Sequence, residues 1–158
     1  MTEFQIINNL PTTLTHGAIE RAVRQFVDDI EDPKVPRDKD GLVIQLLTYI
    51  GHCLIAKIMP QAQVWIAEDD DKEIAAFALT HWEMNVDNKP TLWLSTAWVR
   101  RNHRFTSKPK EWFHRMEEYG KIMGAKHLLI PSARGYKGYL RYIGQGWHKY
   151  EVILKKDL

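Results

Sequence analysis

The spacing of apolar residues changes twice along this chain, and this change limits the fold more than any other sequence feature. Over residues 19–30 and again over residues 42–58, apolar residues recur every three or four positions, as they do on one face of a helix. Over residues 64–100, β-branched and aromatic residues lie between polar turns, which is typical of strands. Helical spacing returns over residues 108–123, and Thr15 is the predicted N-cap of the first helix. The pattern predicts an α/β (α+β) protein.

Shorter segments complete the predicted order. Residues 4–7, 127–130 and 147–156 are predicted strands, and residues 136–143 are a predicted short helix. The order is then β-α-α-β-β-β-α-β-α-β. A meander of three strands followed by a βαβ unit predicts a mixed sheet with helices on both of its faces.

Length, charge and cysteine content limit the class of protein. A chain of 158 residues with 44% hydrophobic side chains fits one domain, and we expect it to span residues 1–158. The net charge of +2 gives no whole-chain sign of a nucleic-acid partner. Cys53 is the single cysteine, which fits a reducing, cytoplasmic location. No apolar run is long enough to predict a membrane span.

Basic residues gather at the predicted junction between residues 91–100 and the helix over residues 108–123. This basic cluster consists of Arg100, Arg101, Arg104, Lys108 and Lys110, with no acidic residue before position 111. Such a concentration suits a ligand with several phosphates. A nucleic-acid backbone and a solvated loop are the alternatives.

Residues on both sides of this junction resemble the GNAT superfamily of acetyl-CoA-dependent N-acetyltransferases. Val99 and Arg104 have the spacing of the family's signature, and Gly124 with Ala125 ends the following helix at the family's distance. Tyr142, followed by a glycine and an aromatic residue, matches a further family pattern. By element order the resemblance covers essentially the whole chain.

The resemblance implies acetyl-CoA as cofactor and a GNAT-like fold. The loop before the third long helix would hold the phosphates, and the preceding strand would hold the pantetheine arm. Two small residues of the family's phosphate loop are replaced here by Ser107 and Pro109, and a proline has no N–H to donate. The implied cofactor-binding residues are Thr96, Ala97, Trp98, Val99, Arg104, Phe105, Thr106, Ser107 and Lys108.

Acetyl transfer to an amine needs a base, donors to the thioester carbonyl and an acid for the leaving thiolate. Tyr142 matches the family's thiolate-protonating tyrosine. For the base, Glu83 and His81 lie at the end of the strand that precedes residues 91–100, and both stay candidates. The seven histidines show no metal-ligand spacing, so no metal site is predicted.

The resemblance therefore implies an N-acyltransferase that transfers directly to a small-molecule or protein amine. Its alternative is a catalytically inactive GNAT-fold protein with a structural or interaction role, for example a bacteriophage protein or virion component. A homodimer or another assembly partner is compatible with either function.

Overall fold

The computed structural model describes residues 4–7, 14–30, 38–55, 62–84 and 87–130. Its helices are α1 (Ala18–Asp29), α2 (Lys39–Ile55), the 3₁₀ helix η1 (Arg101–His103) and α3 (Lys108–Ile122). Its strands are β1 (Gln5–Ile7), β2 (Ala62–Glu68), β3 (Ile74–Met84), β4 (Pro90–Val99) and β5 (His127–Leu129).

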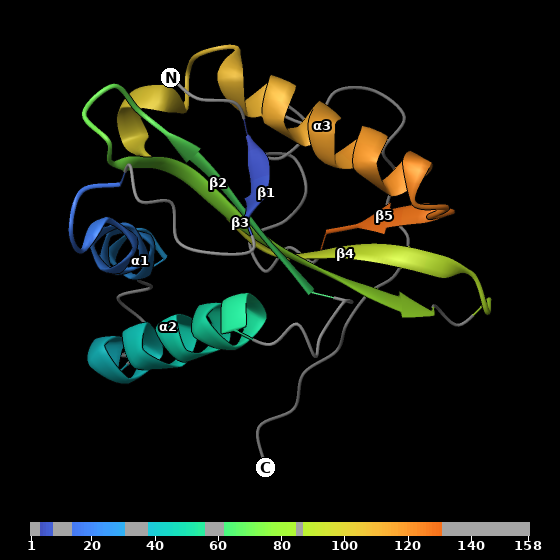
Figure 1. Cartoon of the computed structure of the whole chain (residues 1–158), viewed down its shortest axis with the longest axis horizontal. Helices are drawn as coiled ribbons and strands as arrows, with labels where there is room; N and C mark the ends of the chain where they lie inside the picture. Colours follow the sequence, from blue (N-terminus) through green and yellow to red (C-terminus); the bar gives the residue numbers. More distant parts are fainter. Residues whose placement is uncertain (1–3, 8–13, 31–37, 56–61, 85–86, 131–158) are drawn as a thin grey trace.

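The five strands form one mixed sheet in the order β1-β2-β3-β4-β5. Neighbouring strands are antiparallel except β4 and β5, which are parallel because α3 connects them. Helices α1 and α2 lie on one face of the sheet and α3 on the other (Figure 1). The predicted arrangement is confirmed over these elements, whereas the predicted helix 136–143 and strand 147–156 lie outside the described residues.

The start of α1 differs from the sequence prediction. Thr15 has the character of an N-cap, but the N-cap is Gly17, whose φ of 74° is in the left-handed region. The hydroxyl of Thr15 instead donates to the carbonyl of Asp71, and its N–H donates to the carbonyl of Lys72. Thr15 therefore ties the entry of α1 to the turn between β2 and β3, and this contact replaces the local cap.

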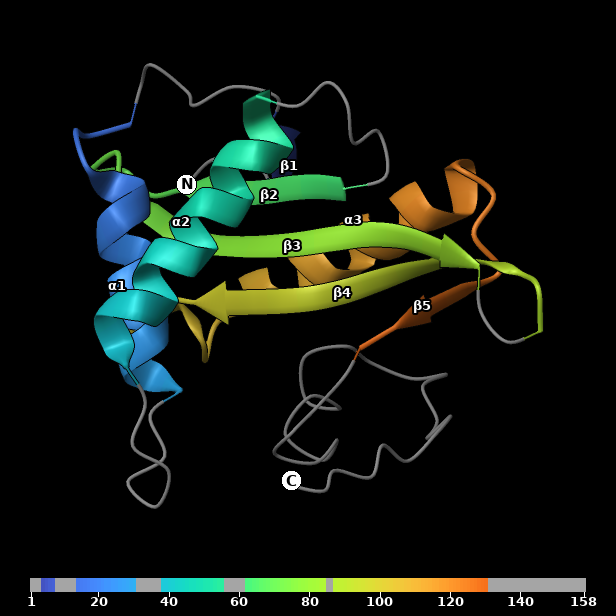
Figure 2. The same cartoon turned by 90° about the horizontal axis from the view of Figure 1, so that it is seen from below.

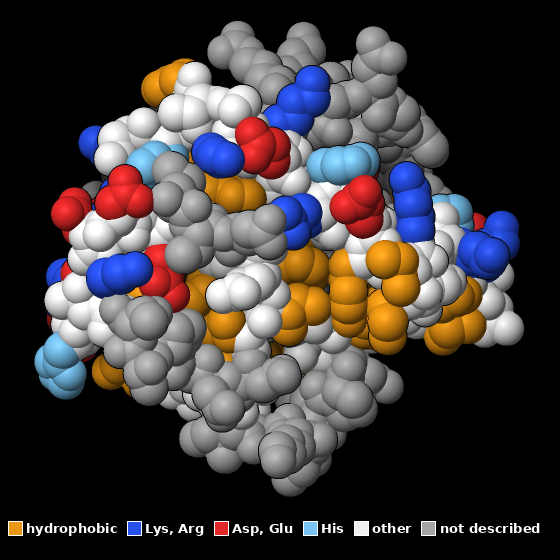
Figure 3. Space-filling view, turned by 45° about the horizontal axis from the view of Figure 1, so that its top comes forward, with side chains coloured by type: hydrophobic (Ala, Val, Ile, Leu, Met, Phe, Trp, Pro, Cys, Tyr) orange, Lys and Arg blue, Asp and Glu red, His pale blue; other side chains and the backbone are white. Residues whose placement is uncertain are grey.

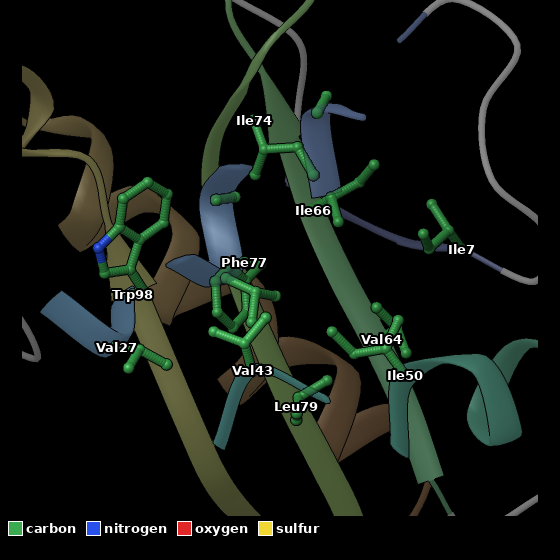
Figure 4. Packing of buried hydrophobic residues seen from close by; sticks show 13 residues of the cluster. Ile7, Val27, Val43, Ile50, Val64, Ile66, Ile74, Phe77, Leu79 and Trp98 are labelled. Atoms are coloured by element: carbon green, nitrogen blue, oxygen red, sulfur yellow. The ribbon is translucent and has the colours of Figure 1, made fainter. Parts of the chain in front are cut away.

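The larger core lies between the sheet and helices α1 and α2 (Figure 4). Side chains from alternate positions of β3 meet a branched apolar stripe on α1, as the two periodicities predict. The fully or nearly buried members include Val23, Val27, Val43, Ile66, Phe77, Leu79 and Trp98.

The second core lies between the sheet and α3. Ala76 and Ala78 of β3 contribute small side chains to this face, and α3 fills the space with Trp112 and Met116. Trp65 of β2 packs against the ring of Tyr119, with 5.3 Å between ring centroids. Large side chains on the helix thus complement small residues on the strand.

Helix α2 is apolar on more than its sheet-facing side, since Val43 is buried while Ile44 is 64% exposed. Among the described helices, none combines the length and the apolar character that crossing a membrane requires.

Gly124 ends α3 as the sequence predicts. Its φ is 88°, and the N–H groups of Gly124 and Ala125 donate to the carbonyls of Lys121 and Gly120. We expect Gly124→Ala to lower the free energy of unfolding by about 1 kcal/mol, because a side chain is strained in this conformation although space is free. Gly51→Ala is the matched control.

Gly51 lies inside α2, and a Cβ added there also meets no atom within 4 Å. Its replacement by alanine is expected to raise stability slightly, by about 0.5 kcal/mol, because alanine favours the helix. Urea unfolding of both variants checks the pair. Equal effects of the two substitutions would contradict a special role for the left-handed conformation at Gly124.

Candidate functional site

The pairing of β4 changes in its middle. Thr80 of β3 opposes Leu94 and Leu79 opposes Thr96, so Ser95 is an extra residue in β4. The parallel pairing with β5 covers only Thr91–Trp93 (Figure 2). From Leu94 to Val99, no described strand pairs with this edge of β4. A β-bulge therefore lies where β4 and β5 separate.

The predicted pantetheine-binding residues lie on this stretch of β4. Thr96, Ala97 and Val99 are half-buried, whereas the side chain of Trp98 is 4% exposed and belongs to the core of α1 and α2. The buried side chain of Trp98 therefore cannot contact a ligand. The backbone N–H and C=O groups of this edge, which pair with no described strand, are further candidates for contact with a ligand.

The loop from β4 to α3 uses most of its own backbone donors. The hydroxyl of Thr106 accepts from the N–H of Lys108, with 3.3 Å between N and Oγ1. The carbonyl of Ser107 accepts from the N–H groups of Lys110 and Glu111. Within the described part of the chain, the N–H groups of Arg101, Asn102, Phe105 and Ser107 are the loop donors without an acceptor.

The two departures from the family's phosphate loop have different consequences. Pro109 lies in the first turn of α3 and is fully buried, so its ring packs into the protein and does not project into solvent. Ser107 is at the N-cap, but its hydroxyl donates to the carboxylate of Glu111 across 3.0 Å. The hydroxyl of Thr106, one residue before the N-cap, instead accepts from the first N–H of α3, a contact that the sequence did not predict.

The basic cluster is largely neutralised. Arg100 pairs with Asp69 at the β2–β3 turn, and Lys108 pairs with Glu111 across 2.9 Å. Lys110 is exposed and has no acidic partner among the described residues. On the side of the molecule that carries α3, basic side chains alternate with acidic ones (Figure 3). The loop thus has a smaller excess of positive charge than its sequence indicates.

Asp29, the last residue of α1, accepts hydrogen bonds from three residues of the loop and β4. Its Oδ1 accepts from Nε and Nη2 of Arg101, at 3.0 and 2.8 Å. Its Oδ2 accepts from Nε1 of Trp98 at 2.9 Å and from Nη2 of Arg104. The Nε of Arg104 donates to the carbonyl of Val99 at 2.7 Å. Sequence reasoning did not find Asp29.

The pKa of Asp29 reflects this arrangement. Burial opposes the charged carboxylate, but hydrogen bonds from Trp98, Arg101 and Arg104 outweigh it and hold the pKa below its ordinary 3.8. The unfolded chain therefore takes up this proton at a higher pH than the folded chain. The stability that Asp29 contributes is complete above pH 3.8 and is lost as the pH falls through the folded pKa.

We expect the difference in unfolding free energy between the wild type and Asp29→Asn to be largest near neutral pH and to shrink as the pH falls below 3.8. Urea unfolding of both proteins across this range measures the difference. A difference that stays constant down to the lowest pH would show that the carboxylate's charge does not contribute.

Glu83 and His81, the two candidate bases, lie side by side at the end of β3. Nε2 of His81 is 3.2 Å from Oε1 of Glu83. The imidazole lies parallel to the indole of Trp93, its partner across the β3–β4 ladder, with 6.4 Å between centroids. This end of β3 extends beyond α1 and α2 (Figure 2). Trp93 is two residues from Ser95, or about 7 Å along the strand.

Other predicted site residues are less informative. Phe105 is 91% exposed at the tip of the loop. Tyr142 lies outside the described residues, so its role as an acid stays a prediction. No group of three or more metal-ligating side chains occurs in the described ranges.

Comparison with solved structures identifies the fold. A protein of Pyrococcus furiosus assigned as an acetyl transferase matches with a TM-score of 0.73 and 14% identity, over 99% of this chain and 100% of that one. A GNAT family acetyltransferase of Staphylococcus aureus matches with a TM-score of 0.62 and 13% identity, over 98% and 97%. Glucosamine-6-phosphate N-acetyltransferase of Arabidopsis thaliana matches with 0.61 and 12%, over 99% and 100%.

No protein-family model matches the sequence, and no curated protein matches it. The likeness to solved structures covers nearly the whole chain, and it shows that the fold is that of the GNAT acetyltransferases. None of the three structures named above is a bacteriophage protein, so the comparison does not support bacteriophage membership. One fold can carry several functions, and the function has to be inferred from the site.

Proposed function

We propose that the protein is an acetyl-CoA-dependent N-acyltransferase that transfers directly to an amine. The observation that carries this proposal is the separation of β4 from β5 at Ser95, followed directly by a loop with basic side chains. An unpaired strand edge suits an amide-containing arm, and the loop suits phosphates. When bound, the cofactor supplies an activated acyl group as a thioester.

The loop provides donors of two kinds for phosphates. Lys110 is exposed, and the side chain of Arg101 is 80% exposed. The N–H groups of Phe105 and Ser107 add two backbone donors. Because the first turn of α3 uses its own donors, phosphate binding here would depend more on side chains than in a standard helix N-terminus.

The pair of His81 and Glu83 is our candidate for proton removal. If Nε2–H of His81 donates to Glu83, the lone pair on Nδ1 is left to accept a proton from the attacking amine. The amine nitrogen would then bond to the acyl carbon as the carbon–sulfur bond breaks. Tyr142 would return a proton to the thiolate. Glu83 is in this proposal a positioning residue for His81.

A non-catalytic GNAT-fold protein with a structural or interaction role is the second candidate. It is favoured by the ion pairs of the basic cluster, since Arg100, Arg104 and Lys108 all have acidic partners before any ligand arrives. Such a loop is stable without phosphates. Its acidic partners would then be permanent structural contacts.

Turnover separates the two candidates. The purified protein is mixed with acetyl-CoA and a panel of primary amines, and the released thiol is measured. The panel begins with glucosamine 6-phosphate, because a structural neighbour acts on it, and includes polyamines and peptide N-termini. The proposal predicts thiol release with at least one amine. A protein that neither turns over nor shifts its melting temperature at millimolar acetyl-CoA would be the non-catalytic one.

A further inference from the structure

The contacts of Asp29 join an element remote in sequence to the candidate phosphate loop. Arg101 and Arg104 are 72 and 75 residues away from Asp29, yet both direct donors at its carboxylate. Two guanidinium groups and one carboxylate leave one net positive charge. The two arginines that donate to this carboxylate are the kind of donors that a phosphate would also bind.

Arg104 and Trp98 are held in place by contacts other than those with Asp29. The Nε of Arg104 is bound to the carbonyl of Val99, which fixes this guanidinium from within its own loop. Trp98 is held by the core, where its ring lies 5.7 Å from that of Phe77. These two donors would keep their positions if the charge on Asp29 were removed, so the main effect of that charge on Arg104 is electrostatic.

We propose that Asp29 is an internal anion that sets the loop's affinity for phosphates: its carboxylate occupies donors of Arg101 and Arg104, and a bound phosphate group has to displace or share them. This inference rests on the proposed phosphate site but not on catalysis. Asp29 then favours ligands with several phosphates over single anions, because only a multiply charged ligand competes well with a carboxylate already in place.

Asp29→Asn removes the charge and keeps the size of the side chain, and its amide oxygen can still accept from Trp98. We expect this variant to bind coenzyme A about tenfold more tightly than the wild type, as expected for removing one unit charge from a partly screened site. Inorganic pyrophosphate, the second probe, should gain affinity in the same direction. Isothermal titration at fixed ionic strength measures both.

Asp28→Asn is the matched control. It makes the same substitution one residue earlier in α1, where the carboxylate pairs with Lys39 across 3.0 Å and not with the loop. Its affinities should equal those of the wild type. In the double variant Asp29→Asn/Arg104→Gln the gain should be largely lost, and this dependence is one that a purely structural effect on α1 would not produce.

The outcomes separate this inference from the proposed function. Tighter pyrophosphate binding by Asp29→Asn, with no binding of coenzyme A by either protein, supports the internal anion and rejects the transferase. Binding of coenzyme A that is unchanged or weaker in Asp29→Asn, while the melting curve stays cooperative, overturns the internal anion and leaves the transferase standing. No pyrophosphate or coenzyme A binding by any variant also overturns it.

Discussion

Replacing His81 with glutamine is expected to lower kcat for acetyl transfer about a hundredfold or more, with little change in the affinity for acetyl-CoA. The expected size is that of losing a positioned general base. Glutamine fills a similar space but cannot take up a proton. His81 lies beside Trp93 and about 7 Å along the sheet from the bulge at Ser95, while the loop that would bind phosphates is at the other end of β4. Proton transfer and cofactor binding should therefore separate.

His114 offers a matched control for this substitution. It also lies close to glutamates, with Nε2 3.4 Å from Glu118, but on the exposed side of α3. His114→Gln should leave kcat unchanged. Glu83→Gln should lower kcat by a smaller factor than His81→Gln, because it removes only the partner of the imidazole. Full activity in His81→Gln would exclude His81 as the base and leave Glu83 or a water molecule.

Replacing Trp98 with alanine is expected to lower the free energy of unfolding by about 3–5 kcal/mol, the range for removing a buried aromatic side chain. The ring is 4% exposed and packs against Phe77 in the core of α1 and α2. Its indole N–H also donates to Asp29. For a domain of this size the melting temperature should fall by roughly 10 °C, at 2–4 °C per kcal/mol.

One further variant separates packing from hydrogen bonding at Trp98, and a second is a control at an exposed position. Trp98→Phe keeps a ring but removes the donor to Asp29, and should cost about 1–3 kcal/mol. Ile44→Ala changes a side chain that is 64% exposed and should change stability little. Thermal and urea unfolding measure all three. A loss in Trp98→Ala no larger than that in Ile44→Ala would contradict the placement of this ring in the core.

The order and type of the elements could be predicted from sequence because they depend on local patterns. The meander over residues 64–100 has alternating β-branched and aromatic residues, and Gly124 marks the end of α3. These signals act over a few residues. The predicted N-cap of α1 was wrong because Thr15 donates to a turn more than fifty residues away. No local sequence pattern indicates such a contact.

The candidate site could be predicted only in part for the same reason. The basic cluster is visible in the sequence, but its neutralisation by Asp29 and Asp69 depends on tertiary contacts. The bulge at Ser95 has no glycine or other local signal. The parallel rings of His81 and Trp93 follow from the register between β3 and β4, which the sequence does not specify.

Hydrogen–deuterium exchange with and without acetyl-CoA tests the central claim most directly. The claim is that the edge of β4 from Leu94 to Val99 and the loop up to Lys108 together hold the cofactor. Saturating acetyl-CoA should slow amide exchange in peptides covering residues 94–108, with little change in α2. Unchanged exchange over residues 94–108 at millimolar acetyl-CoA, or protection confined to another region, would contradict it.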